Sequence, residues 1–122
     1  MANPSDVPAS AAGTEILRRV HGNLTAAGDL VLINGVANHT YTILSVIITN
    51  KDASATETVN MVLGADGQTT NVMLLDLQTI GPKETFIWND KFVMSETDEL
   101  VVSVGETCSV NFLVSYIEQR WA

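Results

Sequence analysis

Short runs rich in Val, Ile, Leu and Thr alternate along the chain with clusters of Gly, Asn, Asp and Pro. Residues of the first group favour strands and those of the second favour turns, so the pattern predicts an all-β domain of about eight strands. Nine runs are the candidates for these strands: residues 14–20, 29–33, 41–49, 57–63, 71–77, 84–88, 91–94, 99–104 and 109–117. The first of these runs is also compatible with a short helix before the sheet.

The longest run is apolar on both of its faces. Leu44, Val46 and Ile48 share one face, and Ile43 and Ile47 share the other. This pattern is typical of a central strand that is covered on both sides. Another subunit is a candidate for the second cover.

Many short antiparallel strands cannot bury themselves as one open sheet. They pack as two sheets face to face or close into a barrel, and we expect an antiparallel β-sandwich of the jelly-roll kind. We expect the core to hold Leu44, Val46, Ile48, Phe112 and Val114. The chain has 122 residues, enough for one such domain over residues 14–122.

Residues 1–13 carry two prolines among small side chains and show no apolar period. This composition predicts an extended N-terminal arm outside the sandwich. The arm either binds a neighbouring molecule through Pro4, Val7 and Pro8 or folds back on its own domain. Near the other end of the chain, Trp121 either anchors in a partner's pocket or covers the open end of the sandwich.

Composition and charge narrow the classes of partner. Charged residues make up 16% of the chain, against about 25% in an average soluble domain, so much of the surface is apolar or hydroxyl-rich and is suited to contact neighbours. The net charge of −8 argues against a nucleic-acid partner. No apolar run approaches the roughly 18 residues of a membrane span, so we expect no membrane partner. The start of the chain lacks the basic and apolar stretches of a secretory signal, and we expect synthesis in a cytoplasm.

Few residues suggest catalytic or metal chemistry. Cys108 cannot form an internal disulfide, and His21 and His39 lack the spacing of a zinc site. Both histidines fall in predicted turns, without a nucleophile elbow, a phosphate loop or a metalloprotease motif. We therefore expect no enzyme, no cofactor and no metal. The acidic stretch 90–99 is either a calcium site or, as we favour, a solvated turn.

Sugar binding needs exposed aromatic platforms, and Trp88 and Trp121 are the main candidates. Trp88 alternates with Phe86 in a predicted strand, so we expect it in the core. The expected core position of Trp88 leaves few aromatic platforms for a sugar. A free carbohydrate-binding module or small hydrolase therefore ranks third among our hypotheses.

The order of segments across residues 30–118 resembles that of small β-sandwich proteins of tailed bacteriophage virions. The matching segments are VIITN (46–50), TVNMVL (58–63), LLD (74–76), IGPKET (80–85), DKFVM (90–94), DELVV (98–102) and VNFLVS (110–115). The resemblance implies a protein without enzymatic activity that decorates a capsid or occupies a tail or fibre position.

The leading hypothesis is a capsid decoration or cement protein, made in the cytoplasm of the bacterial host and bound to the outer surface of the virion. Its partners would be the major capsid protein and copies of itself, most simply as a homotrimer. The pI of about 4.4 favours a position away from packaged DNA. The alternative is a tail or fibre component of the virion that binds a host-surface glycan.

Overall fold

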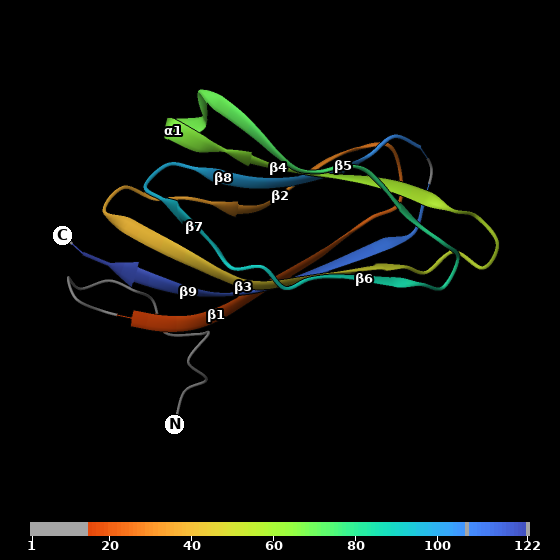
Figure 1. Ribbon diagram of the computed structural model, residues 1–122, viewed down its shortest axis with the longest axis horizontal. Helices are drawn as coiled ribbons and strands as arrows, with labels where there is room; N and C mark the ends of the chain where they lie inside the picture. Colours follow the sequence, from red (N-terminus) through yellow and green to blue (C-terminus); the bar gives the residue numbers. More distant parts are fainter. Residues whose placement is uncertain (1–14, 107, 122) are drawn as a thin grey trace.

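Nine β-strands and one short helical turn make up the computed structural model, which describes residues 15–106 and 108–121 (Figure 1). The elements are β1 (Glu15–Leu24), β2 (Gly28–Asn34), β3 (His39–Asn50), β4 (Glu57–Gly64), α1 (Ala65–Gln68), β5 (Thr70–Ile80), β6 (Thr85–Trp88), β7 (Phe92–Ser95), β8 (Glu99–Val104) and β9 (Val110–Arg120). The predicted all-β sandwich is confirmed. Within the described ranges, no helix has the length and apolar character needed to cross a membrane.

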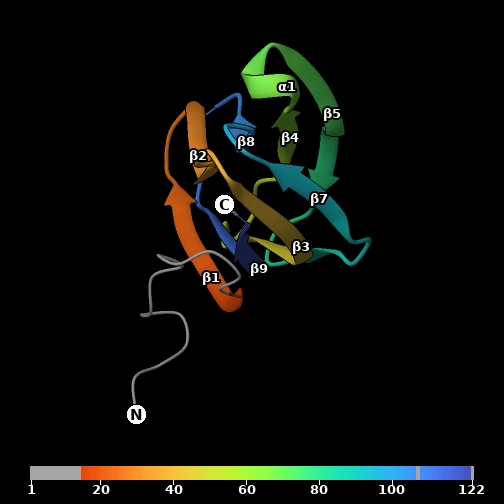
Figure 2. The ribbon, with the colours of Figure 1, turned by 90° about the vertical axis from the view of Figure 1, so that its left-hand side faces the viewer.

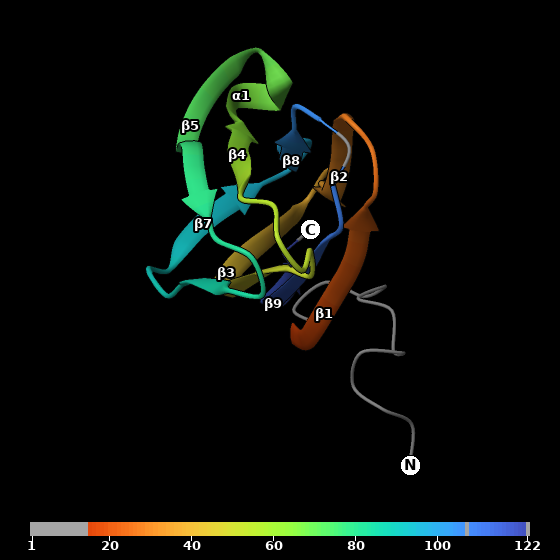
Figure 3. The ribbon, with the colours of Figure 1, turned by 90° about the vertical axis from the view of Figure 1, so that its right-hand side faces the viewer.

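The strands form two antiparallel sheets that face each other (Figure 2). The first sheet has the order β1-β9-β3-β6, and β7 also pairs with β3; the second has the order β2-β8-β4-β5. Figure 3 shows the same two layers from the opposite end, with β1, β9 and β3 below and β2, β8, β4 and β5 above. Most consecutive strands alternate between the two layers, so residues far apart in sequence become neighbours.

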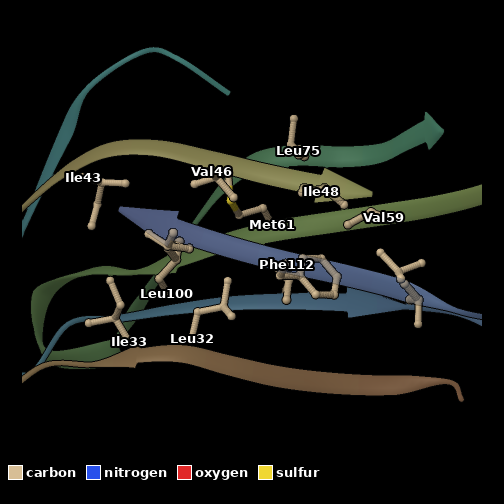
Figure 4. Close-up of a cluster of buried hydrophobic side chains, with 14 of the residues drawn as sticks. Leu32, Ile33, Ile43, Val46, Ile48, Val59, Met61, Leu75, Leu100 and Phe112 are labelled. Atoms are coloured by element: carbon tan, nitrogen blue, oxygen red, sulfur yellow. The ribbon is translucent and has the colours of Figure 1, made fainter. Parts of the chain in front are cut away.

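Apolar side chains from both sheets fill the space between the layers (Figure 4). Val46, Ile48, Phe112 and Val114 are buried, as predicted. The prediction for Leu44 is wrong, because the pairing of β3 with β9 shifts by one residue between Ile43 and Ser45. This irregularity turns Ile43 into the core, where it is fully buried, and leaves Leu44 half-buried.

The first strand extends beyond the expected run, because His21, Gly22 and Asn23 continue β1 instead of ending it. A Cβ atom on Gly22 would lie 2.8 Å from Cδ2 of Leu30, in the other sheet. The glycine therefore allows a close approach between the layers and does not mark a turn. The helical alternative for this segment is also wrong.

Candidate interaction surfaces

The outer face of the first sheet carries a largely apolar row that crosses four strands. Leu17 of β1 lies opposite Ile117 of β9, which lies opposite Thr42 of β3, which lies opposite Val93 of β7. The two ends of this row, Leu17 and Val93, are 56% and 58% exposed. The register therefore aligns apolar side chains on the solvent side of the sheet.

A second apolar row crosses the same face nearer the other end of the strands. Leu113 of β9 lies opposite Ile47 of β3, which lies opposite Ile87 of β6. Ile87 is exposed, and Leu113 and Ile47 border a shallow depression that His21 and Lys51 also line. Charge is sparse on this face: among the outward positions of the described strands, the ionised residues are Glu15 and Arg19, both on β1.

The outer face of the second sheet also carries an apolar row, across all four of its strands. Val31 of β2, Val101 of β8, Val62 of β4 and Met73 of β5 lie opposite one another in that order. Val31 and Met73 are each 47% exposed. Asp29 and Glu99 flank the row, and the described outward positions of this sheet include no Lys or Arg.

Of the four residues predicted to bind a partner, Trp121 lies within the described ranges. Its side chain is 53% exposed, and its backbone N–H donates to the Asn38 carbonyl at 3.0 Å. The exposure fits an anchoring role, which stays a prediction. Pro4, Val7 and Pro8 lie outside the described residues.

Trp88, the other candidate for sugar binding, packs against the core as expected. Its indole N–H donates to the Asp90 carbonyl at 2.7 Å, and its ring meets Phe92 edge-on. Because these contacts hold the Trp88 indole against its own domain, Trp88 is only partly exposed. Trp121 is the more exposed of the chain's two tryptophans.

The two histidines lie in strands, which contradicts the prediction of turns. His21 lies in β1. His39 is the first residue of β3 and pairs with Arg120 at the end of β9. The His39 ring stacks on Tyr41, and its Nε2 atom lies 3.5 Å from the Glu118 carboxylate. His39 therefore belongs to a contact inside the sandwich.

Glu118 joins the N-terminal strand to this contact, because Nε of Arg18 lies 2.9 Å from its other carboxylate oxygen. Arg18, His39 and Glu118 all point to the inner side of the first sheet. Next to them, burial raises the pKa of the Tyr41 phenol, whose oxygen accepts the Val36 N–H at 3.0 Å. No sequence motif indicates this cluster, although the alternation along β9 places Glu118 on the same face as Phe112.

In the acidic stretch 90–99, the Asp98 carboxylate accepts hydrogen bonds from backbone groups of this loop and of a neighbouring one. The two oxygens of Asp98 accept the N–H groups of Gly67 and Ser95 at 3.2 and 3.1 Å. The amide of Gln68 adds a hydrogen bond to the Thr97 carbonyl at 2.8 Å. Over the part of the chain that the structure describes, no group of three or more His, Cys, Asp or Glu side chains could hold a metal ion. The loop thus ties the β4–β5 connection to the β7–β8 turn.

The opposite end of the sandwich buries polar side chains that no sequence motif indicates. Asn50 is fully buried, and the two N–H donors of its Nδ2 are shared among the carbonyl oxygens of Ala55, Ile80 and Gly81, which lie 2.9 to 3.1 Å from this nitrogen. Glu57 is only 1% exposed. Burial raises the pKa of its carboxyl, and the carboxylates of Glu106 and Asp52 raise it further.

Cys108 lies at the same end and is buried. Its thiol donates to the Leu24 carbonyl at 3.3 Å, and burial raises its pKa, with nearby carboxylates adding to the shift. A raised pKa keeps the thiol protonated and unreactive at neutral pH.

No protein-family model and no curated protein matches the sequence. Several solved structures share the fold. A protein of Bacillus endospore appendages, from a family of disulfide-linked pili, has a TM-score of 0.56 over 95% of this chain and 96% of its own, at 13% identity. A chain of the cyanophage Pam1 capsid asymmetric unit has a TM-score of 0.50 over 95% of this chain and 96% of its own, at 14% identity.

A third match is the major capsid protein P2 from bacteriophage PM2, with a TM-score of 0.52 over 91% of this chain, at 12% identity. This chain spans 46% of the length of that protein. The sandwich fold is therefore shared with phage capsid proteins and with a spore pilus. At these identities the likeness extends to the fold alone.

Proposed function

We propose that the chain is a structural protein of a bacteriophage virion, without enzymatic activity, that acts as a capsid decoration or cement protein. The observation that supports this most is the set of exposed apolar rows that cross the outer faces of both sheets. A sandwich that works alone usually presents polar side chains on the outside of its sheets. Here Leu17, Ile117 and Val93 line one outer face, and Val31, Val101 and Met73 line the other. Such rows fit a domain that neighbouring subunits contact on both sides.

The structural comparisons are consistent with this assignment. The matching chain in the cyanophage capsid asymmetric unit consists almost entirely of this one domain, because the match covers 96% of it. A covalently linked pilus is less well supported, because Cys108 is the chain's single cysteine and is buried.

Stabilisation of the shell follows from how such a protein binds. A subunit that spans several capsid proteins must be released before the shell opens, so bound copies stabilise the closed state by mass action. Weak contacts on separate faces add through multivalency. We assign contacts with the major capsid protein to the apolar rows on the two outer faces, to Trp121 and to the arm residues Pro4, Val7 and Pro8. The net charge of −8 favours the outer surface of the shell, away from packaged DNA.

Quantitative mass spectrometry on purified virions of the source phage tests the proposal. We expect a copy number equal to that of the major capsid protein, or a simple fraction of it, because only the shell offers that many equivalent sites. A handful of copies per particle would instead identify a tail or fibre component. Absence from the particles would overturn the virion assignment and favour a free binding module.

A further inference from the structure

Each sheet of the sandwich has edge strands, and most of these edge strands are either short or irregularly paired with their neighbour. The pairing of β2 with β8 shifts between Val31 and Ile33, and the pairing of β5 with β4 shifts at two points. β6 and β7 have only four residues each. Bulges and short length are the devices that protect an edge against pairing with another chain.

β1 lacks these protections. All ten of its residues pair with β9 in unbroken register, from Glu15 opposite Gln119 to Leu24 opposite Val110. It contains no proline, and no strand pairs with its other edge within the described residues. A long regular edge of this kind is a template for one more strand.

We propose that β1 pairs antiparallel with β1 of a second copy of this chain, across a two-fold axis at Leu17. The pairing would join the first sheets of the two copies into one continuous sheet. The unit of self-association would then be a dimer. The sequence had led us to expect a trimer. The proposal rests on the edge strand alone and does not depend on a role in a virion.

Charge favours this register over those centred on Arg18 or Arg19. With the axis at Leu17, Glu15 of each copy lies opposite Arg19 of the other, so the contact contains two pairs of opposite charge. Moving the axis to Arg18 or Arg19 would place like-charged arginines opposite each other. Opposite charges in facing cross-strand positions stabilise a sheet, and like charges destabilise it. Both Glu15 and Arg19 are exposed on the outer face in the single chain.

The same register also completes the apolar row of the first sheet. Leu17 is the end of the row that continues through Ile117 and Thr42 to Val93. Placing Leu17 against its own symmetry copy joins the rows of the two molecules and covers a leucine that is 56% exposed in the single chain. In this register residues 15–19 of the two copies face one another, so the occupant that fits the start of this edge by charge and apolar pattern is a second copy of the chain.

Sedimentation velocity over a range of protein concentrations tests the pairing. We expect a monomer–dimer equilibrium for the wild type and a dissociation constant raised about tenfold or more in Arg19→Glu, because each Glu15 would then face another glutamate. The double variant Glu15→Arg/Arg19→Glu should restore dimerisation by exchanging the charges. Lys91→Glu makes the same charge change at an exposed site outside β1 and should leave the equilibrium unchanged.

A wild type that stays monomeric, or forms a trimer, would overturn the proposal. So would an Arg19→Glu variant that dimerises as well as Lys91→Glu. Because the experiment uses the purified chain without capsids, its outcome is separate from that of the virion assignment.

Cross-linking checks the register directly. Residues facing each other in an antiparallel pair have Cβ atoms about 4.5–5.5 Å apart, close to the reach of a disulfide. Leu17→Cys should therefore form a covalent dimer under mild oxidation. Ile87→Cys, equally exposed but on the opposite edge of the sheet, should not, and the buried Cys108 of the wild type sets the background. Equal cross-linking of the two variants, or none in either, would contradict the register.

Discussion

Nε of Arg18 lies 2.9 Å from the carboxylate of Glu118, and this contact joins the first and last strands of the domain on the inner side of their sheet. Both side chains are less than one-fifth exposed, with side-chain exposures of 19% and 14%. Removing one partner leaves the other charge partly buried without this counter-charge. The cost in free energy of folding is larger than that of losing a surface ion pair.

We expect Arg18→Ala to lower the free energy of unfolding by about 1–3 kcal/mol, measured by urea denaturation in dilute solution. Arg19→Ala is the matched control, because it removes the same side chain one residue further on, from the exposed face of the same strand. We expect the control to change stability by less than about 0.5 kcal/mol. Equal effects of the two substitutions would show that the contact with Glu118 contributes nothing.

Gly22→Ala tests whether the glycine in β1 is required by packing. The added methyl group would meet Leu30 at 2.8 Å, and the leucine side chain must rotate away. We expect a loss of about 1 kcal/mol in thermal or chemical unfolding, at the low end for overpacking because the contact is with the tip of a side chain. Gly105→Ala adds the same group where nothing lies within 4 Å, so a loss of equal size there would refute the packing explanation.

The pattern of apolar and polar residues predicted the fold class well, because the period of a strand is local. The predicted run 99–104 coincides with β8 (Glu99–Val104). The errors have physical causes that the pattern does not contain. Leu44 leaves the core because of a shift in pairing, and Gly22 and His39 lie in strands because contacts with the other layer or the neighbouring strand extend those strands.

The candidate surfaces were less predictable, because they depend on strand order and register. The row that begins at Leu17 continues with Ile117, a hundred residues later in the chain, and then with Thr42. Arg18 and Glu118 are equally distant in sequence. Composition indicated a surface suited to neighbours, but only the pairing of the strands shows which apolar residues share a face.

The buried carboxyl of Glu57 should make stability depend on pH. Its pKa in the folded chain is raised above the ordinary value of 4.5 by burial and then by the carboxylates of Glu106 and Asp52. The unfolded chain therefore releases this proton at lower pH than the folded chain does. The contribution of Glu57 to stability is fully present below pH 4.5 and is lost as the pH rises through the raised pKa.

Replacing Glu57 by Gln removes this ionisation. We expect Glu57→Gln to match the wild type at low pH and to exceed it in free energy of unfolding as the pH approaches neutrality, measured by urea denaturation at a series of pH values. Asp76→Asn removes an exposed carboxylate from the same sheet as a control, and its difference from the wild type should change little with pH. A Glu57→Gln variant that loses stability near neutral pH would show that the carboxylate is stabilising.

The apolar row of the second sheet should carry part of the binding to a capsid. Val31→Glu and Met73→Glu place a charge at either end of the row, at side chains that are already 47% exposed, so the fold should persist with an unchanged circular dichroism spectrum. A buried, unpaired charge at an interface is costly, and we expect each variant to weaken co-sedimentation with capsids that lack the chain by about tenfold or more.

Val36→Glu makes the same change at a side chain that is 54% exposed in the turn between β2 and β3, away from both faces. Binding that is equally weakened in all three variants would indicate a general effect of negative charge. Binding that is unchanged in Val31→Glu and Met73→Glu would exclude this face from the contact with the shell.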